Sequence, residues 1–160
     1  MKEKNKNQAQ AERNMAQAMK NQRAKQQEKQ AQAQAEKEER EEAEARAEYE
    51  ATKQARKAHR AVAKAKQAEA RARRAEAEAK MAKEQREKAE KEETENPTEA
   101  NRRRAEGMRG HQEEAEAEAK SQRRKATKRL KEAKAETNKA KQMRAIADHR
   151  REAYQEEQTA

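Results

Sequence analysis

Alanine recurs every seven residues on two interleaved tracks between residues 51 and 89, and no other feature constrains the fold of this chain as much. The tracks are offset by three and four residues, so all of their members fall on one face of an α-helix. This is a coiled-coil pattern in which every inward side chain is only a methyl group. The alanines are Ala51, Ala58, Ala61, Ala65, Ala68, Ala72, Ala75, Ala79, Ala82 and Ala89.

A second heptad of alanines follows near the C-terminus and ends on Tyr154. The positions three residues after its members hold mixed side chains, such as Gln122, Arg129 and Glu136, so it forms only half of a coiled-coil face. We refer to both tracts together as the alanine seam, and we predict that it is the surface on which helices pack. Its C-terminal members are Ala119, Ala126, Ala133, Ala140 and Ala147.

The composition excludes a compact single-chain core. Hydrophobic residues make up 31% of the chain, most of them alanine, and Phe, Trp and Cys are absent. Ordering the backbone costs about 1–2 kcal/mol per residue, whereas burying one methyl group contributes about 0.8 kcal/mol. The good helix formers Ala, Glu, Lys, Arg and Gln dominate, with only two glycines and one proline. The sequence therefore predicts an all-α protein of long extended helices without a globular core.

The predicted helices are interrupted at Pro97, which lacks the backbone donor that a helix interior needs. Proline also disfavours helical geometry at the residue before it, so Asn96 suits the N-cap of the next helix. Pro97 would then be the first helical residue, and Glu99 would complete a capping box. The spacing therefore predicts that one helix ends near residue 95 and that another begins at Asn96.

A second break is expected at Gly107 and Gly110, because each glycine costs about 1 kcal/mol relative to alanine inside a helix. The two breaks define three segments. Residues 1–95 are predicted to form a long N-terminal helix with a frayed start before about Ala9. Residues 96–110 would hold the capped break and a short helix, and residues 111–160 would form a basic C-terminal helix.

Charge is distributed in blocks along the chain, whose formal net charge is +10. Segment 36–50 carries a net −5, whereas 51–75 carries +8 and 120–151 carries +10. A hairpin centred near Pro97 would lay the two basic blocks beside each other, and facing like charges are destabilising. We therefore expect the free chain to be extended or loosely hinged, and to fold back only when a polyanion or an acidic protein surface lies along these blocks.

Clusters of basic residues are the strongest functional signal in the sequence. They are dense enough to hold phosphate groups electrostatically, whereas the scarcity of aromatic residues argues against stacking on single-stranded bases. A solvated helix face is the competing interpretation of these clusters, and a membrane surface is disfavoured because large apolar residues do not accompany the charge. The candidate phosphate contacts are Arg102, Arg103, Arg104, Arg123, Arg124, Lys125, Lys128 and Arg129.

Enzymatic chemistry is not expected. His59, His111 and His149 are the only histidines and lie too far apart in the sequence to share a metal ion from one helix, and no cysteine could join them. The many glutamates have no interior in which their pKa could be raised for acid–base catalysis. We therefore predict no enzyme activity, no metal, no cofactor and no small-molecule substrate.

Targeting signals are also not expected, because no run of the sequence is apolar enough for a signal peptide or a transmembrane helix. Together with the lack of cysteine, this favours an intracellular protein, or one inside a particle, over a secreted one.

The Ala/Glu/Lys/Arg-rich stretch 36–95 resembles the charge-stabilised single α-helices and alanine-rich rod segments that serve as spacers in many proteins. The resemblance is compositional, covers about a third of the chain and implies a structural role without active residues. We therefore expect a non-enzymatic structural or scaffolding protein that docks on a larger assembly, or on another copy, through the alanine seam and the charge blocks. The alternative is an RNA- or DNA-binding accessory protein that uses its basic helix faces.

Overall fold

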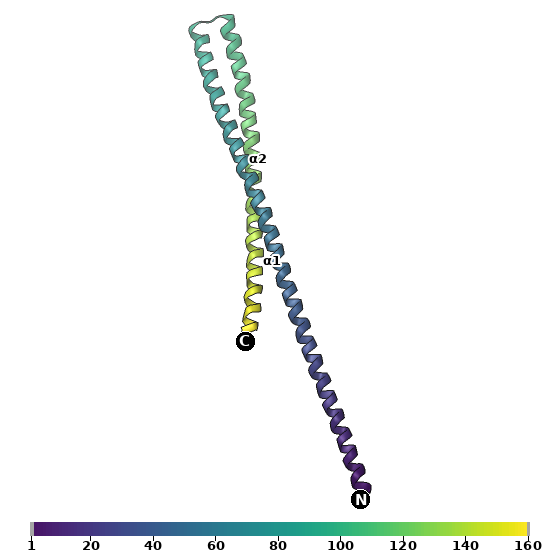
Figure 1. The fold of residues 1–160 in the computed structure, drawn as a ribbon. Helices are drawn as coiled ribbons and strands as arrows, with labels where there is room; N and C mark the ends of the chain where they lie inside the picture. The colour runs from purple at the N-terminus through teal and green to yellow at the C-terminus, as the bar shows by residue number, and fades with distance from the viewer. Residues whose placement is uncertain (1, 160) are drawn as a thin grey trace. The chain divides into compact units, whose positions relative to one another are not determined.

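The computed structural model describes residues 2–159, which form two long helices, α1 (Lys2–Glu95) and α2 (Glu99–Thr159) (Figure 1). No strand occurs among these residues, so the predicted all-α architecture of long helices is confirmed. The predicted outer boundaries at residues 1 and 160 lie outside the described residues. The frayed start expected before Ala9 is wrong, because α1 is already helical at Lys2 and no glycine or proline interrupts it.

The chain divides into two compact units, each of which takes part of both helices. The first comprises Met1–Glu48 and His149–Ala160, and the second comprises Tyr49–Asp148. The second unit, which we refer to as the hairpin, contains every buried side chain of the described chain.

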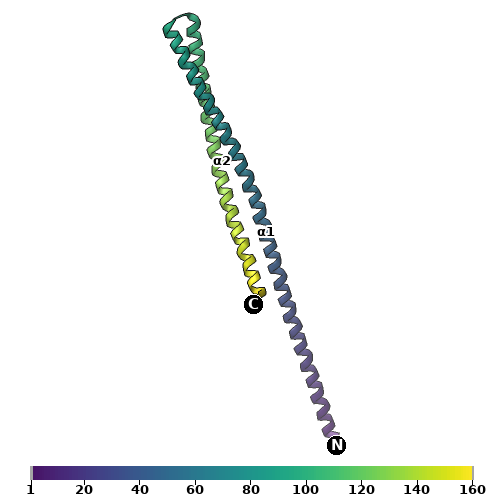
Figure 2. The same ribbon diagram turned by 60° about the vertical axis from the view of Figure 1, so that its left-hand side comes forward.

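Within the hairpin, α1 and α2 run antiparallel and lie side by side (Figures 1 and 2). The ion pairs between the helices follow this order. Glu90 contacts Arg109 near the turn at 2.9 Å, and Glu76 contacts Arg123 farther from the turn at 2.7 Å. The contacts therefore define one antiparallel register. Later residues of α1 contact earlier residues of α2, and both lie closer to the turn.

The interior of the hairpin consists of alanine. Ala75, Ala79 and Ala119 form a buried cluster, against which the partly buried Ala115 packs. The other buried side chains are also seam alanines, except for Ala105 and Gln54. Small side chains let two helix backbones approach closely, so the helices are joined by a row of methyl contacts and the hairpin has no core of large side chains.

One polar contact interrupts this row of alanines. The Gln54 residue is only 7% exposed, and its amide nitrogen donates hydrogen bonds to the backbone carbonyl of Glu136, at 3.4 Å, and to the Glu136 carboxylate. The Lys57 ammonium lies 3.6 Å from the other oxygen of that carboxylate. A buried polar pair of this kind favours one register of two helices, because sliding them would leave the amide without its partner.

The expectation that the charge blocks keep the free chain from folding back is wrong for Tyr49–Asp148. The net charge of a block ignores which helix face each side chain occupies. Where the helices meet, carboxylates of α1 lie beside arginines of α2, and Glu69 and Glu76 both accept hydrogen bonds from Arg123. Most other cations of the two blocks are exposed to solvent, where salt screens like charges over about 8–10 Å.

The turn between the helices lies at the predicted break around Pro97. Asn96 is not the N-cap of α2, because its backbone N–H still donates to the Glu92 carbonyl at 2.9 Å as the last bond of α1. Its own carbonyl accepts a hydrogen bond from the Thr98 N–H at 2.8 Å, which closes a tight turn over Pro97. The fixed φ of proline therefore serves the turn rather than the first position of the helix.

Thr98 is the N-cap of α2. Its hydroxyl accepts a hydrogen bond from the Asn101 backbone N–H at 3.2 Å, and its carbonyl accepts the first helical bond from Arg102 at 3.0 Å. Glu99 is consequently the first residue of the helix and not the return partner of a capping box, so that prediction is also wrong. At this position its carboxylate still stabilises the N-terminal end of the helix dipole.

The break expected at Gly107 and Gly110 is wrong, because α2 continues through both glycines and neither has a positive φ. A glycine weakens a helix by only about 1 kcal/mol, which contacts with a neighbouring helix can offset. Arg109, between the two glycines, reaches α1 and lies 2.9 Å from Glu90 and 3.6 Å from Glu93. The segments predicted as 96–110 and 111–160 therefore share a single helix.

Replacing both glycines by alanine is expected to stabilise the hairpin by about 1–2 kcal/mol, since an alanine costs less entropy to order in a helix. A Cβ added at Gly107 or Gly110 would meet nothing within 4 Å, so no steric penalty opposes the gain. Urea unfolding measures the change when it is followed by the distance between spin labels attached to α1 and to α2. A double variant no more stable than the parent would contradict an uninterrupted α2.

In the first unit, α1 and the end of α2 are connected by polar contacts. The Arg151 guanidinium lies 2.8 Å from the Glu48 carboxylate, and the Tyr154 hydroxyl donates a hydrogen bond to Glu41. Residues 4–42 of α1 are exposed throughout. Their helix depends on local side-chain pairs and on the strong helix propensity of the residues, not on burial.

Candidate polyanion-binding surface

The structure places all fifteen residues of the predicted alanine seam in the hairpin. Twelve are buried, with Ala72 at 0% exposure, and Ala61, Ala68 and Ala140 are partly buried. Their burial comes from the opposite helix of the same chain, so the seam is covered within the hairpin. A binding partner of the folded hairpin can therefore reach only the margins of the seam and the other faces of the helices.

Half of the predicted phosphate contacts are bound to carboxylates of the chain itself. The N···O distances are 2.7 Å for Arg103–Glu99, 3.0 Å for Arg104–Glu92, 2.7 Å for Arg123–Glu69 and 3.3 Å for Arg129–Glu132. The other four form no ion pair with any described residue, and all of them are exposed: Arg102, Arg124, Lys125 and Lys128. The predicted set therefore mixes residues that hold the structure with residues that are available to a ligand.

Arg123 is the clearest case of a structural arginine. Its guanidinium holds Glu76 through two hydrogen bonds, of 2.7 and 2.8 Å, and donates a third to Glu69 at 2.7 Å. These hydrogen bonds raise the pKa of Arg123 and lower the pKa of both glutamates. Because Arg123 lies on α2 and both glutamates lie on α1, the cluster joins the two helices.

Acidification is expected to destabilise the hairpin. The pKa of Glu90 is lowered by its hydrogen bond from Arg109, and that of Glu136 by its hydrogen bond from Gln54, in addition to the two glutamates held by Arg123. A carboxyl group whose pKa is lowered in the folded state stabilises the fold at pH values above its unfolded-state pKa, which is about 4.3. That stability is lost as the pH falls through the folded-state pKa.

Thermal unfolding between pH 7 and pH 3 tests this expectation. The midpoint should change little down to about pH 5 and fall below about pH 4.5. The effect should be modest, because these carboxylates are partly exposed and their ion pairs are screened by water. A variant with glutamine at Glu69 and Glu76 should show a smaller drop, and a midpoint that rises on acidification would contradict the assignment.

The outward side of α2 forms a continuous positively charged face. Positions one, two and five residues after a seam alanine lie opposite the seam on a helix, and between residues 120 and 145 none of these positions holds a carboxylate. We refer to the exposed cations at these positions as the α2 cationic face: Lys120, Arg124, Lys128, Lys131, Lys134 and Lys141. None of them forms an ion pair with a described residue.

The two carboxylates of this stretch of α2 are occupied elsewhere. Glu136 accepts hydrogen bonds from Gln54 inside the hairpin, and Glu132 lies 3.3 Å from Arg129. They therefore do not neutralise the outward cations. Four of the six face residues were not among the predicted phosphate contacts, because Lys120, Lys131, Lys134 and Lys141 are spread along the sequence and meet only on the helix surface.

Helix α1 carries a corresponding face over residues 51–75. The single carboxylate there is Glu69, which lies 2.7 Å from Arg123 and 3.2 Å from Arg73. The exposed cations opposite the seam, here the α1 cationic face, are Lys53, Arg56, Arg60, Lys66 and Arg74. The middle of the hairpin thus presents cations outward on both helices, with its carboxylates bound near the contact between the helices.

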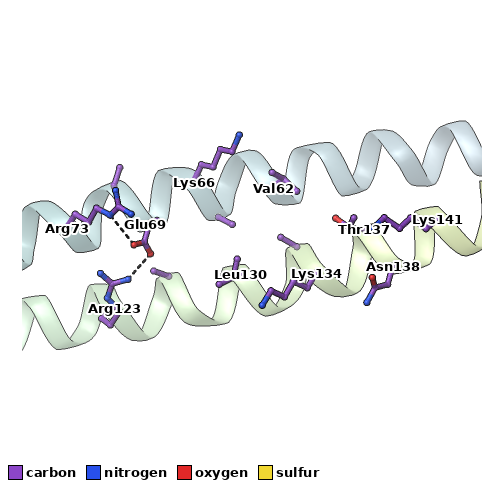
Figure 3. A pocket seen from close by; sticks show the side chains of 14 residues that line it. Val62, Lys66, Glu69, Arg73, Arg123, Leu130, Lys134, Thr137, Asn138 and Lys141 are labelled. Atoms are coloured by element: carbon purple, nitrogen blue, oxygen red, sulfur yellow. Dashed lines mark hydrogen bonds and ion pairs between the residues drawn. The ribbon is translucent and has the colours of Figure 1, made fainter.

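A groove of about 1080 Å³ follows one margin of the hairpin between α1 and α2. Val62 from α1 and Leu130 from α2 line it, together with small seam residues (Figure 3). Figure 3 also shows Lys66 and Lys134 directed away from the opposite helix, so their ammonium groups lie at the outer edges of the groove. Leu130 is 49% exposed, which leaves half of a large apolar side chain in contact with water.

Other kinds of site receive no support from the described residues. No group of three or more His, Cys, Asp or Glu side chains among them is placed to hold a metal ion. Hydrogen bonds from arginine or glutamine lower the pKa of Glu69, Glu76, Glu90 and Glu136, whereas a general acid needs a raised pKa. In the part of the chain that the structure describes, no helix has the long apolar stretch that spanning a bilayer requires.

Comparisons with models of protein families, with curated proteins and with solved structures give no significant match.

Proposed function

We propose that this chain is a non-enzymatic structural protein that attaches to a larger assembly by holding nucleic-acid phosphates along the outward cationic faces of its hairpin. The observation that carries the proposal is the α2 cationic face, on which six exposed cations have no ion pair with a described residue and no carboxylate lies among them. Cations concentrated in this way attract a polyanion strongly, because each phosphate that is neutralised releases a condensed counterion.

The length of the face suits a nucleic acid. From Lys120 to Lys141 it extends for about 32 Å, at 1.5 Å per residue. Double-stranded DNA carries one charge per about 1.7 Å of its axis, so many phosphates are within reach of a straight row of cations.

The chemistry of the face favours binding without sequence specificity. The chain has only two aromatic residues, Tyr49 and Tyr154, and neither lies between residues 120 and 145, so stacking on unpaired bases is not available there. The only apolar residues at the outward positions are Ala135 and Ala145, whereas a helix that binds in a membrane interface needs large apolar side chains. A duplex or a structured RNA is therefore the best fit.

The burial of the alanine seam also supports an outer docking surface. Docking through seam residues such as Ala65 and Ala72 would first require the hairpin to open, because both are buried between its helices. The cationic faces are accessible while the hairpin is closed. The role in a larger assembly is therefore assigned to the charged faces, and the seam serves the folding of the chain itself.

Salt dependence tests the proposal directly. Fluorescence anisotropy should detect binding of the full chain to a labelled duplex of about 30 base pairs. With six phosphates neutralised, the log–log slope of affinity against salt should be about −5, which is a loss of about 1000-fold between 50 and 200 mM. Absence of binding at 50 mM salt, or a slope close to zero, would exclude a phosphate-holding function.

A further inference from the structure

The groove along the margin of the hairpin has the dimensions of a helix-binding site. Its lining runs from Val62 to Arg73 on α1 and from Arg123 to Lys141 on α2. At 1.5 Å per residue these stretches are about 17 and 27 Å long, which corresponds to three to five turns of an α-helix. A third helix of that length would lie between α1 and α2, as helices do in a bundle.

The floor of the groove offers apolar contacts that the hairpin leaves uncovered. Val62 and Leu130 are two of the few large apolar residues in the chain, and they come from opposite helices to line the same groove. The alanines beside them, such as Ala126, are too small to fill the space between the helices. Large apolar side chains from a third helix would fill it and remove the exposed half of Leu130 from water.

The edges of the groove are positively charged. Lys66 and Arg73 line it on α1, and Lys134 and Lys141 line it on α2. Glu69 is the only carboxylate in the lining, and it is held by Arg123 at 2.7 Å and by Arg73 at 3.2 Å. A helix with acidic residues on both flanks of its apolar face would therefore meet cations on both sides.

We propose that this groove binds an acidic amphipathic helix of another protein as a third helix, with large apolar side chains over Val62 and Leu130 and carboxylates beside the flanking cations. A nucleic acid would use the cations but would leave the apolar floor exposed to water. A second copy of this chain fits less well, because its most acidic described segment, 36–50, carries a single large apolar side chain, Tyr49. The inference goes beyond the phosphate-holding function and does not depend on it.

A synthetic helical peptide provides the test. The probe consists of three heptads of Leu-Glu-Ala-Leu-Glu-Glu-Ala, labelled for fluorescence anisotropy and titrated with the full chain. A second peptide with alanine in place of each leucine has the same charge. The leucine peptide should bind at least tenfold more tightly than the alanine peptide, because only the leucines can cover the floor of the groove.

Two variants of the chain locate the peptide. Leu130→Gln should weaken binding of the leucine peptide about tenfold, whereas Ile146→Gln should not change it, since Ile146 is equally exposed on α2 but does not line the groove. Leu130→Gln should leave duplex binding unchanged, which separates this inference from the proposed function. The proposal would be overturned if the two peptides bound equally well or if the two variants had equal effects. Loss of duplex binding in Leu130→Gln would overturn it too, as would a second copy of the chain that competes with the peptide for the groove.

Discussion

Replacing Lys120, Arg124, Lys128 and Lys131 together by glutamine is expected to weaken duplex binding at least 100-fold at 0.1 M salt. Each lost phosphate contact displaces one counterion fewer, which at this salt concentration changes affinity by up to about tenfold. The log–log salt slope should also become shallower, from about −5 to about −2. Glutamine retains high helix propensity, so α2 should stay helical. Anisotropy titrations at several salt concentrations measure both effects.

The matched control removes four cations from a part of α1 outside the hairpin, by changing Lys20, Arg23, Lys25 and Lys29 to glutamine. Both variants then have the same formal net charge. The control should keep most of the affinity and most of the salt slope, because its cations are not part of the α2 cationic face. Equal losses in the two variants would show that overall charge governs binding and that the face has no special role.

The helices and the break between them could be predicted from the sequence because both depend on local interactions. Helix propensity acts residue by residue, and Pro97 excludes a continuous helix wherever it occurs. Helix propensity alone overestimates the effect of Gly107 and Gly110 on α2. Each costs only about 1 kcal/mol, which is small compared with contacts between the helices such as those of Arg109. Propensity therefore indicates where a helix is weak but not whether it breaks.

The fold-back could not be predicted from charge blocks because its contacts join residues far apart in the sequence. Glu76 and Glu69 lie 47 and 54 residues from Arg123, and Gln54 lies 82 residues from Glu136. A seven-residue repeat of alanine is the same whether the second helix belongs to the same chain or to another one. The repeat thus indicates which alanines can face a helix, but it does not identify that helix.

The candidate site was only partly visible for a related reason. Runs such as Arg102–Arg104 are conspicuous in the sequence, yet Arg103 and Arg104 are bound to glutamates. Lys131 and Lys141 are isolated in the sequence but share a face with Lys120. A search for carboxylate-free positions opposite the seam would have found this face, because it requires only the helical period and the seam register.

The second large effect is expected at the centre of the seam, where Ala72→Glu should open the hairpin. Ala72 is fully buried, so a glutamate there adds both volume and an unpaired charge between the helices. We expect a loss of more than about 3 kcal/mol of hairpin stability, because the added side chain has no space between the helices and its carboxylate would lose its hydration there. The matched control is Ala77→Glu, which introduces the same residue at an exposed position of α1.

The distance between the helices is the appropriate measurement, because helicity alone would not report the opening. The separated helices retain the local pairs and propensities that support residues 4–42 without burial, so circular dichroism should change little. The chain has no cysteine, and spin labels can therefore be placed on cysteines introduced at Lys80 and Lys120. Ala72→Glu should replace a short, narrow distance distribution with a long, broad one, whereas Ala77→Glu should keep the short distance. If Ala72→Glu also kept the short distance, the alanine contacts would not be what holds α1 and α2 together. The ion pairs of Arg109 and Arg123 would then have to supply the stability.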